Sequence, residues 1–444
     1  MKKHSLTSAL FLSLSLVLIV SSCSETSKEP SFKLHPTEKF LFRSFVDCNM
    51  AEVWIADTFR IFPGKHGEDT LWGYSDNLRF GNGKNADEAF SNQFEDLIQP
   101  DMPPNVKPSV YVKQWSDPSA EKGVVGAVWF ETVYQDARDA SGKTLYAVYH
   151  NENYPWNFPH DPVSGQGYID KHWPRGLTGP HSPAAVSRIG IMKSINGGYK
   201  WENKGIFIED LQPRMILKPH NTSNIFAGGV GDPSAVASGD YLYLFYGEYG
   251  YPGTYDSATY NPDVEWRGQC ISVARIRIDD LDNPAGKARR WDGKGFNGAP
   301  DGVGAPVRSL QIPLEEGGGA SSAPDKEFHW GPSVSWNTYL NCWVMLMGKV
   351  EAKSWVGSSI WISYNFNKDL GEGDHSQQWT KPKMILDKPG HILWYPSLQP
   401  MNTEEDIQNR YTCTRLGKRA RLFFKDQAGP YSEYLSEYII EFEK

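Results

Sequence analysis

Two aspartates, Asp47 and Asp57, flank an apolar run within Phe45 to Arg60, and the residue types of this run predict a β-strand. Hydrolysis of a glycosidic bond generally uses two carboxyl groups about 5 to 9.5 Å apart, one protonated and one ionised. Carboxylates at strand ends that meet at one mouth of a sheet structure suit that chemistry. We therefore expect Asp47 and Asp57 to be catalytic candidates.

The spacing of these two aspartates sets a geometric condition. If residues 47 to 57 formed one straight strand, the carboxylates would stand about 33 Å apart, because a strand advances about 3.3 Å per residue. They converge only if the chain reverses between them. A hairpin centred near Glu52 would place them opposite each other, whereas one centred on the turn former Asn49 would separate them.

Two further candidate acids, Asp232 and Glu152, occupy predicted strand starts or ends. Asp232 lies in the run Gly-Asp-Pro-Ser, where it either points into a central cavity or caps a turn before Pro233. Glu152 follows His150 and Asn151 at the end of the apolar strand TLYAVY, where binding residues often concentrate, although a solvated polar turn is the alternative. His150 at this place could tune the pKa of a carboxylate or hold a sugar hydroxyl.

Aromatic residues are abundant, with 16 Trp, 22 Tyr and 21 Phe, and flat side chains suit the apolar faces of sugar rings. Most of them are expected in the core, because each buries a large area. The residues that we expect to contact substrate are Arg60, His150, Asn151, Trp156, Glu248, His329 and Trp330.

Apolar, aromatic-rich runs recur in clusters along the chain, with turn residues between them and without long helical periodicity. The clusters lie at 40–62, 124–193, 241–278, 343–364 and 421–442. Five groups of short antiparallel strands predict an all-β, five-bladed β-propeller spanning residues 40–444. A β-sandwich is the alternative.

Short turn-forming runs that contain proline recur along the chain and support the prediction of blades. The runs Gly-Asp-Pro-Ser at 231–234, Gly-Pro-Ser at 331–333 and Tyr-Pro-Ser at 395–397 each precede an apolar strand, as expected for innermost strands. The segment SINGGYKW at 194–201 resembles the Asp-box hairpin of sialidase-type propellers, with Asn196 in place of aspartate. That resemblance implies a structural turn far from the substrate, and residues 363–365 with Trp379 are a candidate second copy.

The run Ala56-Asp57-Thr58-Phe59, with Asp47 upstream and Gly-Asp-Pro-Ser later, resembles glycoside hydrolase family 183, the endo-D-arabinanases. The resemblance implies a five-bladed propeller that cleaves α-D-arabinofuranosyl linkages using aspartates. Asp57 would match the aspartate of the Gly-Asp-Thr-Phe motif and Asp47 the earlier one. Ala56 replaces the glycine of that motif, and beyond the start of the domain the likeness is limited to the regular spacing of the predicted blades.

The first 23 residues have the pattern of a bacterial lipoprotein signal, with Lys2 and Lys3, a short apolar run and small residues before Cys23. We expect cleavage before Cys23 and lipidation there, which would anchor the protein to the outer-membrane surface or the periplasmic side of the envelope. A secretory signal cut elsewhere is the alternative. Residues 24–39 are polar and predict a flexible tether.

The remaining cysteines, Cys48, Cys270, Cys342 and Cys413, are dispersed without a CxxC pair or zinc spacing, so we expect no cysteine metal site and no cofactor. Either one disulfide or buried free thiols fit this pattern. Acidic oxygens are numerous enough for a structural calcium ion in the channel, although no EF-hand spacing is present. A net charge of −8 without a basic cluster argues against a nucleic-acid partner.

Three hypotheses of function follow from these residues. The leading one is an exported, lipid-anchored glycoside hydrolase that acts on an oligo- or polysaccharide, with arabinan as one candidate. The second is a polysaccharide lyase, in which His150 or Tyr149 removes a proton and an arginine neutralises a uronate. The third is a noncatalytic surface glycan-binding propeller, in which the aromatic residues bind sugar and the acids are structural.

Overall fold

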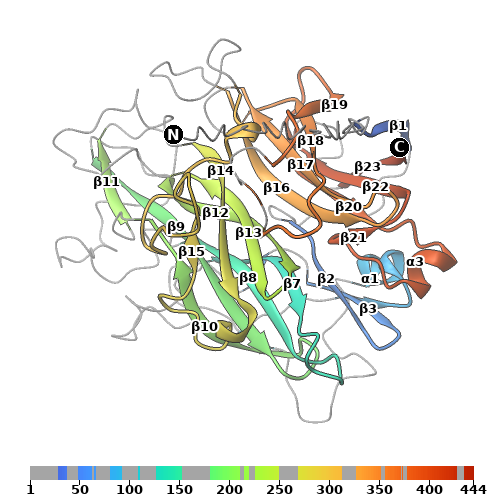
Figure 1. Ribbon diagram of the computed structural model, residues 1–444, viewed down its shortest axis with the longest axis horizontal. Helices are drawn as coiled ribbons and strands as arrows, with labels where there is room; N and C mark the ends of the chain where they lie inside the picture. The colour runs from blue at the N-terminus through green and yellow to red at the C-terminus, as the bar shows by residue number, and fades with distance from the viewer. Residues whose placement is uncertain are drawn as a thin grey trace, which may run out of the picture.

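The computed structural model describes residues 29–37, 49–62, 65–66, 81–92, 109–110, 127–152, 181–210, 215–219, 226–249, 269–312, 327–351, 356–371, 373, 378–427 and 435–444. Within these residues nearly all of the regular elements are β-strands (Figure 1). None of the helices in this part of the chain has the length and apolar character needed to span a bilayer.

The strands form five consecutive antiparallel units, which we call blades I to V in chain order. Blade I contains β2 (Ala51–Ile55), β3 (Thr58–Phe62) and β5 (Gly81–Gly83). Blade II contains β7 (Ala127–Gln135), β8 (Leu145–Glu152), β9 (His181–Ser194) and β10 (Lys200–Ile208). Blade III contains β12 (Phe226–Ser238), β13 (Tyr241–Glu248), β14 (Cys270–Arg277) and β15 (Arg289–Arg290).

The last two blades follow the same order. Blade IV contains β16 (Phe328–Asn337), β17 (Cys342–Val350), β18 (Ser359–Asn365) and β19 (Lys383–Asp387). Blade V contains β20 (Leu393–Gln399), β22 (Arg419–Asp426), β23 (Leu435–Glu443) and, as its outer strand, β1 (Ser31–Pro36). The other short elements, some between blades and some within them, are β4 (Lys65–His66), β6 (Ser109–Val110), β11 (Met215–Pro219), β21 (Arg415–Leu416), α1 (Ala86–Ser91) and α3 (Glu404–Gln408).

The first strand of each blade is its inner strand, and successive inner strands contact one another from β2 through β7, β12 and β16 to β20. Apolar clusters fill the space between blades I and II, II and III, III and IV, and IV and V. A further cluster joins blade V back to blade I, where Phe423 and Leu435 pack with Met50, Trp54 and Phe59. The ring is therefore closed, and the described residues confirm the prediction of an all-β, five-bladed propeller.

Burial on both faces explains the composition of the strands. A blade packs against a neighbour on each side, so strands such as β8 and β13 are buried over nearly their whole length and have continuous apolar runs instead of alternation. The strand clusters predicted from these runs correspond to β2–β3, β7–β9, β13–β14, β17–β18 and β22–β23.

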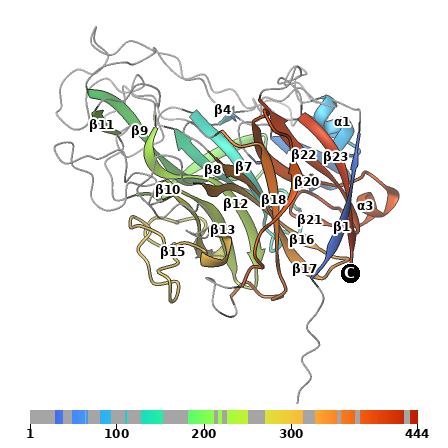
Figure 2. The ribbon, with the colours of Figure 1, turned by 90° about the horizontal axis from the view of Figure 1, so that it is seen from above.

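The predicted tether contains one error. Residues 31–36 form β1, which pairs antiparallel with β23 from Ser31 opposite Glu443 to Pro36 opposite Tyr438. Figure 2 shows this N-terminal strand beside β23. The prediction failed because an edge strand of polar, exposed residues has the composition of a linker. The ring is thus closed by a strand from each end of the described chain.

The Asp-box-like segment lies where the resemblance implied. It turns from β9 to β10 in blade II, and Asn196 accepts hydrogen bonds from Ser194 and from the Lys200 amide at 2.9 and 3.0 Å. Trp201 is buried between blades I and II. In blade IV, Asn365 accepts from the Asn367 amide at the end of β18, and Trp379 is buried, so the second copy has a similar place.

Three of the four dispersed cysteines, Cys270, Cys342 and Cys413, are buried free thiols. They lie in blades III and IV and next to β21, which excludes a disulfide among these three. Cys48 lies outside the described residues.

Candidate active site

A β-bulge interrupts the inner strand of blades II to V near its start. The bulges lie between Phe130 and Thr132, Gly231 and Ser234, Trp330 and Ser333, and Trp394 and Ser397. We call the end of the ring where these bulges lie the bulge end. A bulge re-aims the side chain that it carries, and bulges are common next to functional sites.

Three of these bulges share one backbone conformation. Asp232, Gly331 and Tyr395 have φ values of 49°, 57° and 51°, and each precedes a proline. This left-handed conformation costs a non-glycine residue of order 1 to 3 kcal/mol and is found mostly where the surrounding structure imposes it. The repeated Pro-Ser runs therefore belong to inner strands, as predicted from sequence, but each proline lies inside its strand, at a bulge, instead of before it.

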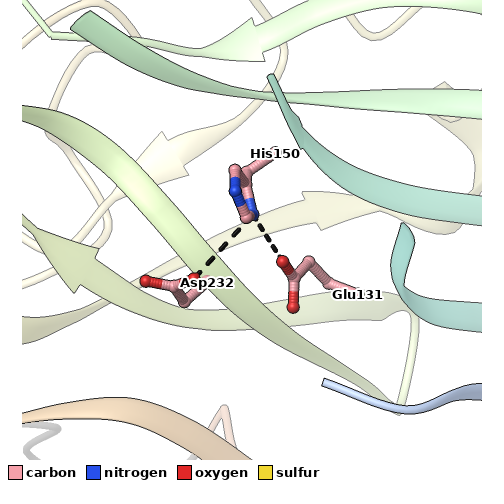
Figure 3. Close-up of side chains that lie close together, drawn as sticks. All are labelled: Glu131, His150 and Asp232. Carbon is pink, nitrogen blue, oxygen red and sulfur yellow. Dashed lines mark hydrogen bonds and ion pairs between the residues drawn. The ribbon is translucent and has the colours of Figure 1, made fainter. Parts of the chain in front are cut away.

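Glu131, His150 and Asp232 form a buried cluster at the bulge end (Figure 3). Glu131 and Asp232 come from the bulges of β7 and β12, and His150 from the end of β8. His150 Nδ1 bonds Glu131 Oε1 and lies 3.9 Å from Asp232 Oδ1. On the other side of the ring, His150 Nε2 lies 3.5 Å from Glu152 Oε1, so the imidazole lies between three carboxylates.

Neighbouring donors satisfy the carboxylate oxygens of this cluster. The Asn49 amide, just before β2, donates to Glu131 Oε2 at 2.7 Å. The Trp129 indole donates to Glu152 Oε2 at 2.7 Å and stacks on His150 with an interplanar angle of 20°. The hydroxyls of Tyr249 and Tyr395 donate to Asp232. Blades I, II, III and V therefore all contribute, which places the cluster at the centre of the ring.

Burial changes the proton affinities of these groups. It raises the pKa of Glu131 to about 7, although the positive charge of His150 opposes the shift. Burial lowers the pKa of His150, but the charge of Glu131 and the hydrogen bonds to Glu131 and Glu152 outweigh it, so this pKa lies well above 6.5. Burial also raises the pKa of Asp232, while His150 and Tyr249 oppose that shift. The His150–Glu131 pair therefore retains a proton at neutral pH, which suits acid–base chemistry.

Glu131, His150 and Asp232 could also reach a common cation, because one ligand atom from each lies within 4.8 Å of the others. Their oxygens already accept hydrogen bonds from Asn49, His150 and tyrosine, so proton transfer is the chemistry that this arrangement supports. A structural calcium ion elsewhere in the channel stays a prediction, which metal analysis of the purified protein would test.

Asp57 lies away from this cluster. It occupies the turn between β2 and β3, where Ala56 has a φ of 50°, and its side chain is fully exposed beside Arg410 at 3.6 Å. Asn49 lies at the cluster, and eight residues of extended chain place Asp57 roughly 25 Å from it. Asp57 therefore does not belong to the buried cluster. The hairpin centred near Glu52 is wrong, because β2 runs straight through Glu52. Asp47 lies outside the described residues.

Two residues predicted to contact substrate have structural partners instead. Arg60 is buried between blades I and II, where it donates to Asn82, to the Gly197 carbonyl and to Tyr199. Glu248 is buried against Arg290 and accepts from the Gly304 amide at 3.0 Å. Sequence could not separate these positions from the site, because a buried charge on a strand has the same local pattern whichever neighbour pairs with it.

Of the other residues predicted to contact substrate, His329 and Asn151 have structural partners, whereas Trp330 packs next to the cluster. His329 Nδ1 donates to the Leu310 carbonyl at 2.7 Å, and burial lowers its pKa to about 4, so it is a neutral core residue between blades. Asn151 accepts from Arg188 at 3.1 Å on the opposite face of β8 from His150. Trp330 is buried and packs edge-on against Tyr395, whose hydroxyl reaches Asp232. Trp156 lies outside the described residues.

His150, Glu152 and Asp232 were identified from sequence, and the structure brings these three together. Glu131 was missed, although a lone acid inside the apolar strand AVWFETVY is a signal that could have revealed it. Asp232 does not act as a turn cap, because its carboxylate oxygens accept hydrogen bonds from tyrosine hydroxyls.

Comparison with known proteins gives remote structural likenesses. No protein-family model matches the chain, and no curated protein matches it. The GH43 endo-arabinanase from Bacillus licheniformis is 11% identical with a TM-score of 0.40, over 90% of this chain and 95% of that chain. An α-L-arabinanase from Cellvibrio cellulosa is 12% identical with a TM-score of 0.41, over 89% and 92% of the two chains.

The catalytic domain of a GH62 α-L-arabinofuranosidase from Coprinopsis cinerea is 9% identical with a TM-score of 0.41, over 93% of this chain and 97% of that chain. Values this low carry no argument about activity. The fold therefore rests on the strand pairing described above, and the function on the buried cluster.

Proposed function

We propose that this protein is an exported glycoside hydrolase that acts on a polysaccharide. The observation that carries the proposal is the arrangement of Glu131, His150, Glu152 and Asp232 at the centre of the bulge end. A hydrolytic site needs one carboxyl group that holds a proton and one that is ionised, and environments that differ between neighbouring acids supply that difference.

Asp232 and Glu152 are the best pair for the two roles. They contact opposite nitrogens of His150, at 3.9 and 3.5 Å. Since the two nitrogens of an imidazole are about 2 Å apart, the carboxylates are separated by at most about 10 Å, an upper limit that is compatible with two-carboxylate hydrolysis. Glu131 is fully buried and held by two donors, so it acts through His150 and not on the substrate.

Aromatic side chains lie beside this pair on blades IV and V. Trp330, Trp394 and Tyr395 pack edge-to-face, with centroids 5.2 to 6.2 Å apart. Trp394 and Tyr395 are half-buried, and a side chain at Gly331 would meet no atom within 4 Å. We expect the half-buried ring of Trp394 to provide a flat surface for the apolar face of a sugar.

Trp394→Ala is expected to raise KM about 10-fold or more with a smaller change in kcat, because stacking would contribute to binding in the ground state as well as the transition state. Steady-state kinetics on the cleaved polysaccharide would measure this split. Phe366→Ala, an exposed aromatic beyond β18, is the matched control and should leave KM unchanged. A selective loss of kcat in Trp394→Ala would contradict the stacking role.

The two alternatives have less support. For a lyase, Tyr149 is a poor base, because its buried hydroxyl bonds Asn203 and burial raises its pKa. In the part of the chain that the structure describes, Arg188 contacts Asn151 and Glu209. For a noncatalytic glycan-binding protein, three buried ionisable groups at the centre of the ring, Glu131, His150 and Asp232, would be costly without a chemical use.

Incubating the protein with a panel of purified polysaccharides, arabinans included, tests the proposal. Hydrolysis would give reducing sugars without ultraviolet absorbance, whereas a lyase would give unsaturated products that absorb. Binding without cleavage across the panel would favour the third hypothesis. A D-arabinan substrate, as the resemblance to family 183 implies, is one arm of the panel.

The proposal includes a lipid anchor at Cys23, a prediction from sequence that lies outside the described residues. Cys23→Ala is expected to abolish incorporation of labelled palmitate and to release the protein from membranes, because the thiol carries the lipid. Fractionation of cells expressing both forms would measure it. Cys413→Ala, a change at a buried thiol, is the control and should still incorporate label. Equal labelling of Cys23→Ala would exclude the anchor.

A further inference from the structure

The Asp232 carboxylate accepts one tyrosine hydroxyl on each oxygen. The Tyr249 hydroxyl donates to Oδ2 at 2.5 Å, and the Tyr395 hydroxyl donates to Oδ1 at 3.2 Å. The first tyrosine follows β13 in blade III, and the second lies in the bulge of blade V. Two blades that are far apart in sequence therefore hold a single side chain.

The position of Tyr249 depends on two glycines. Gly231 and Gly247 face each other across β12 and β13, and the Tyr249 ring lies over both. A Cβ at Gly247 would lie 1.9 Å from the Tyr249 ring, and one at Gly231 would lie 3.3 Å from it. The Tyr249 amide also donates to the Gly229 carbonyl at 2.8 Å. Gly247 therefore has no room for a side chain while the Tyr249 ring reaches Asp232, and a side chain at Gly231 would press on the same ring.

A phenol at neutral pH is a donor, and burial together with the charge of Asp232 raises the pKa of Tyr249 further. An ionised carboxylate accepts from both hydroxyls, whereas a protonated one loses an acceptor position to its own proton. Among the residues that the structure describes, the other charged or titratable groups that face Asp232 are His150, Glu131 and Glu152.

We propose that Tyr249 and Tyr395 are positioning residues that hold Asp232 as an ionised carboxylate in a fixed orientation, which makes Asp232 the base of the site. The proton of the cluster then resides on the His150–Glu131 side, and His150 Nε2, 3.5 Å from Glu152 Oε1, passes it to Glu152, the acid that protonates the leaving group. This assignment rests on the proposed glycoside hydrolase function and adds which carboxyl group acts as the base and which as the acid.

Tyr249→Phe removes the shorter hydrogen bond and keeps the ring on its glycine platform. The acid limb of the kcat/KM pH profile is expected to move up by about one pH unit, because the ionised form of Asp232 loses a donor. Tyr395→Phe should move it less, since its contact is longer. Tyr246→Phe is the matched control: Tyr246 lies on β13, three residues before Tyr249, and is buried, but its hydroxyl contacts Arg290 and Ser272. An unmoved acid limb in Tyr249→Phe, or an equal shift in Tyr246→Phe, would overturn the proposal.

A second measurement does not require activity. Thermal unfolding of Tyr249→Phe, Asp232→Asn and the double variant forms a double-mutant cycle. The shifts in Tm are expected to be non-additive at pH 8, where Asp232 is ionised, and to approach additivity as Asp232 is protonated in acid. Additive shifts at both pH values would exclude the coupling even for an active enzyme. Coupling without cleavage of any polysaccharide would instead remove the hydrolase function and leave the charge state of Asp232 established.

Discussion

Asp232→Asn is expected to lower kcat/KM on the cleaved polysaccharide by about 10³-fold, because it removes the carboxylate that acts as base while keeping the shape of the side chain. Both tyrosine hydroxyls can still donate to the amide oxygen or shift slightly, so the fold should persist. Circular dichroism and Tm would confirm that the variant is folded, and initial rates would measure the loss.

Asp57→Asn is the matched control for this variant. It makes the same chemical change at an exposed turn roughly 25 Å away, and activity should stay within a factor of two of the unchanged protein. If Asp57→Asn abolished turnover and Asp232→Asn did not, the assignment of the site to the buried cluster would be refuted.

Glu248→Ala is expected to destabilise the fold by about 3 to 5 kcal/mol, because it leaves the Arg290 guanidinium buried without its counter-charge. Arginine cannot lose its proton in a protein, so no protonation change relieves the cost. Denaturant unfolding at pH 7 would measure the loss in free energy of unfolding. A loss below about 1 kcal/mol would show that the pair contributes little.

Arg290→Met removes the other member of the same ion pair and tests the protonation of Glu248. Burial already raises the pKa of Glu248 to about 7 with arginine present, so without arginine the carboxyl can take up a proton. A folded pKa above the unfolded value of about 4.5 gives stability that is present below pH 4.5 and lost as pH rises through the folded pKa. Arg290→Met should therefore cost less than Glu248→Ala at pH 5, and its cost should grow towards pH 8.

The architecture could be predicted from local chemistry. Strands that are buried on both faces need continuous apolar runs, and the bulges of three inner strands need a left-handed residue followed by proline. Both requirements can be recognised in short stretches of sequence, as in the bulge at Gly231–Ser234. The count of five blades followed from the five clusters of apolar runs.

The candidate site was only partly predictable, because its contacts join positions far apart in the chain. His150, Glu152 and Asp232 were identified because each ends a strand or occupies a bulge. The same reasoning selected Asp57, since a sequence does not say which end of a strand faces the site. Tyr249 left no signal, because its role depends on two glycines facing each other across β12 and β13.

The closing strand β1 has a mechanical consequence. The inner strands begin at the bulge end, and pairing along blade V places Ser31 beside Glu443 at the opposite end of the ring. From Cys23 to Ser31 the chain spans at most about 29 Å, so a lipid on Cys23 would hold that opposite end near the bilayer, with the cluster facing outwards.

If a bound polymer pulled the protein away from the membrane, the force would act on β1 along the direction of that strand. The ladder hydrogen bonds are perpendicular to the strands, so they would resist together in shear instead of opening one at a time.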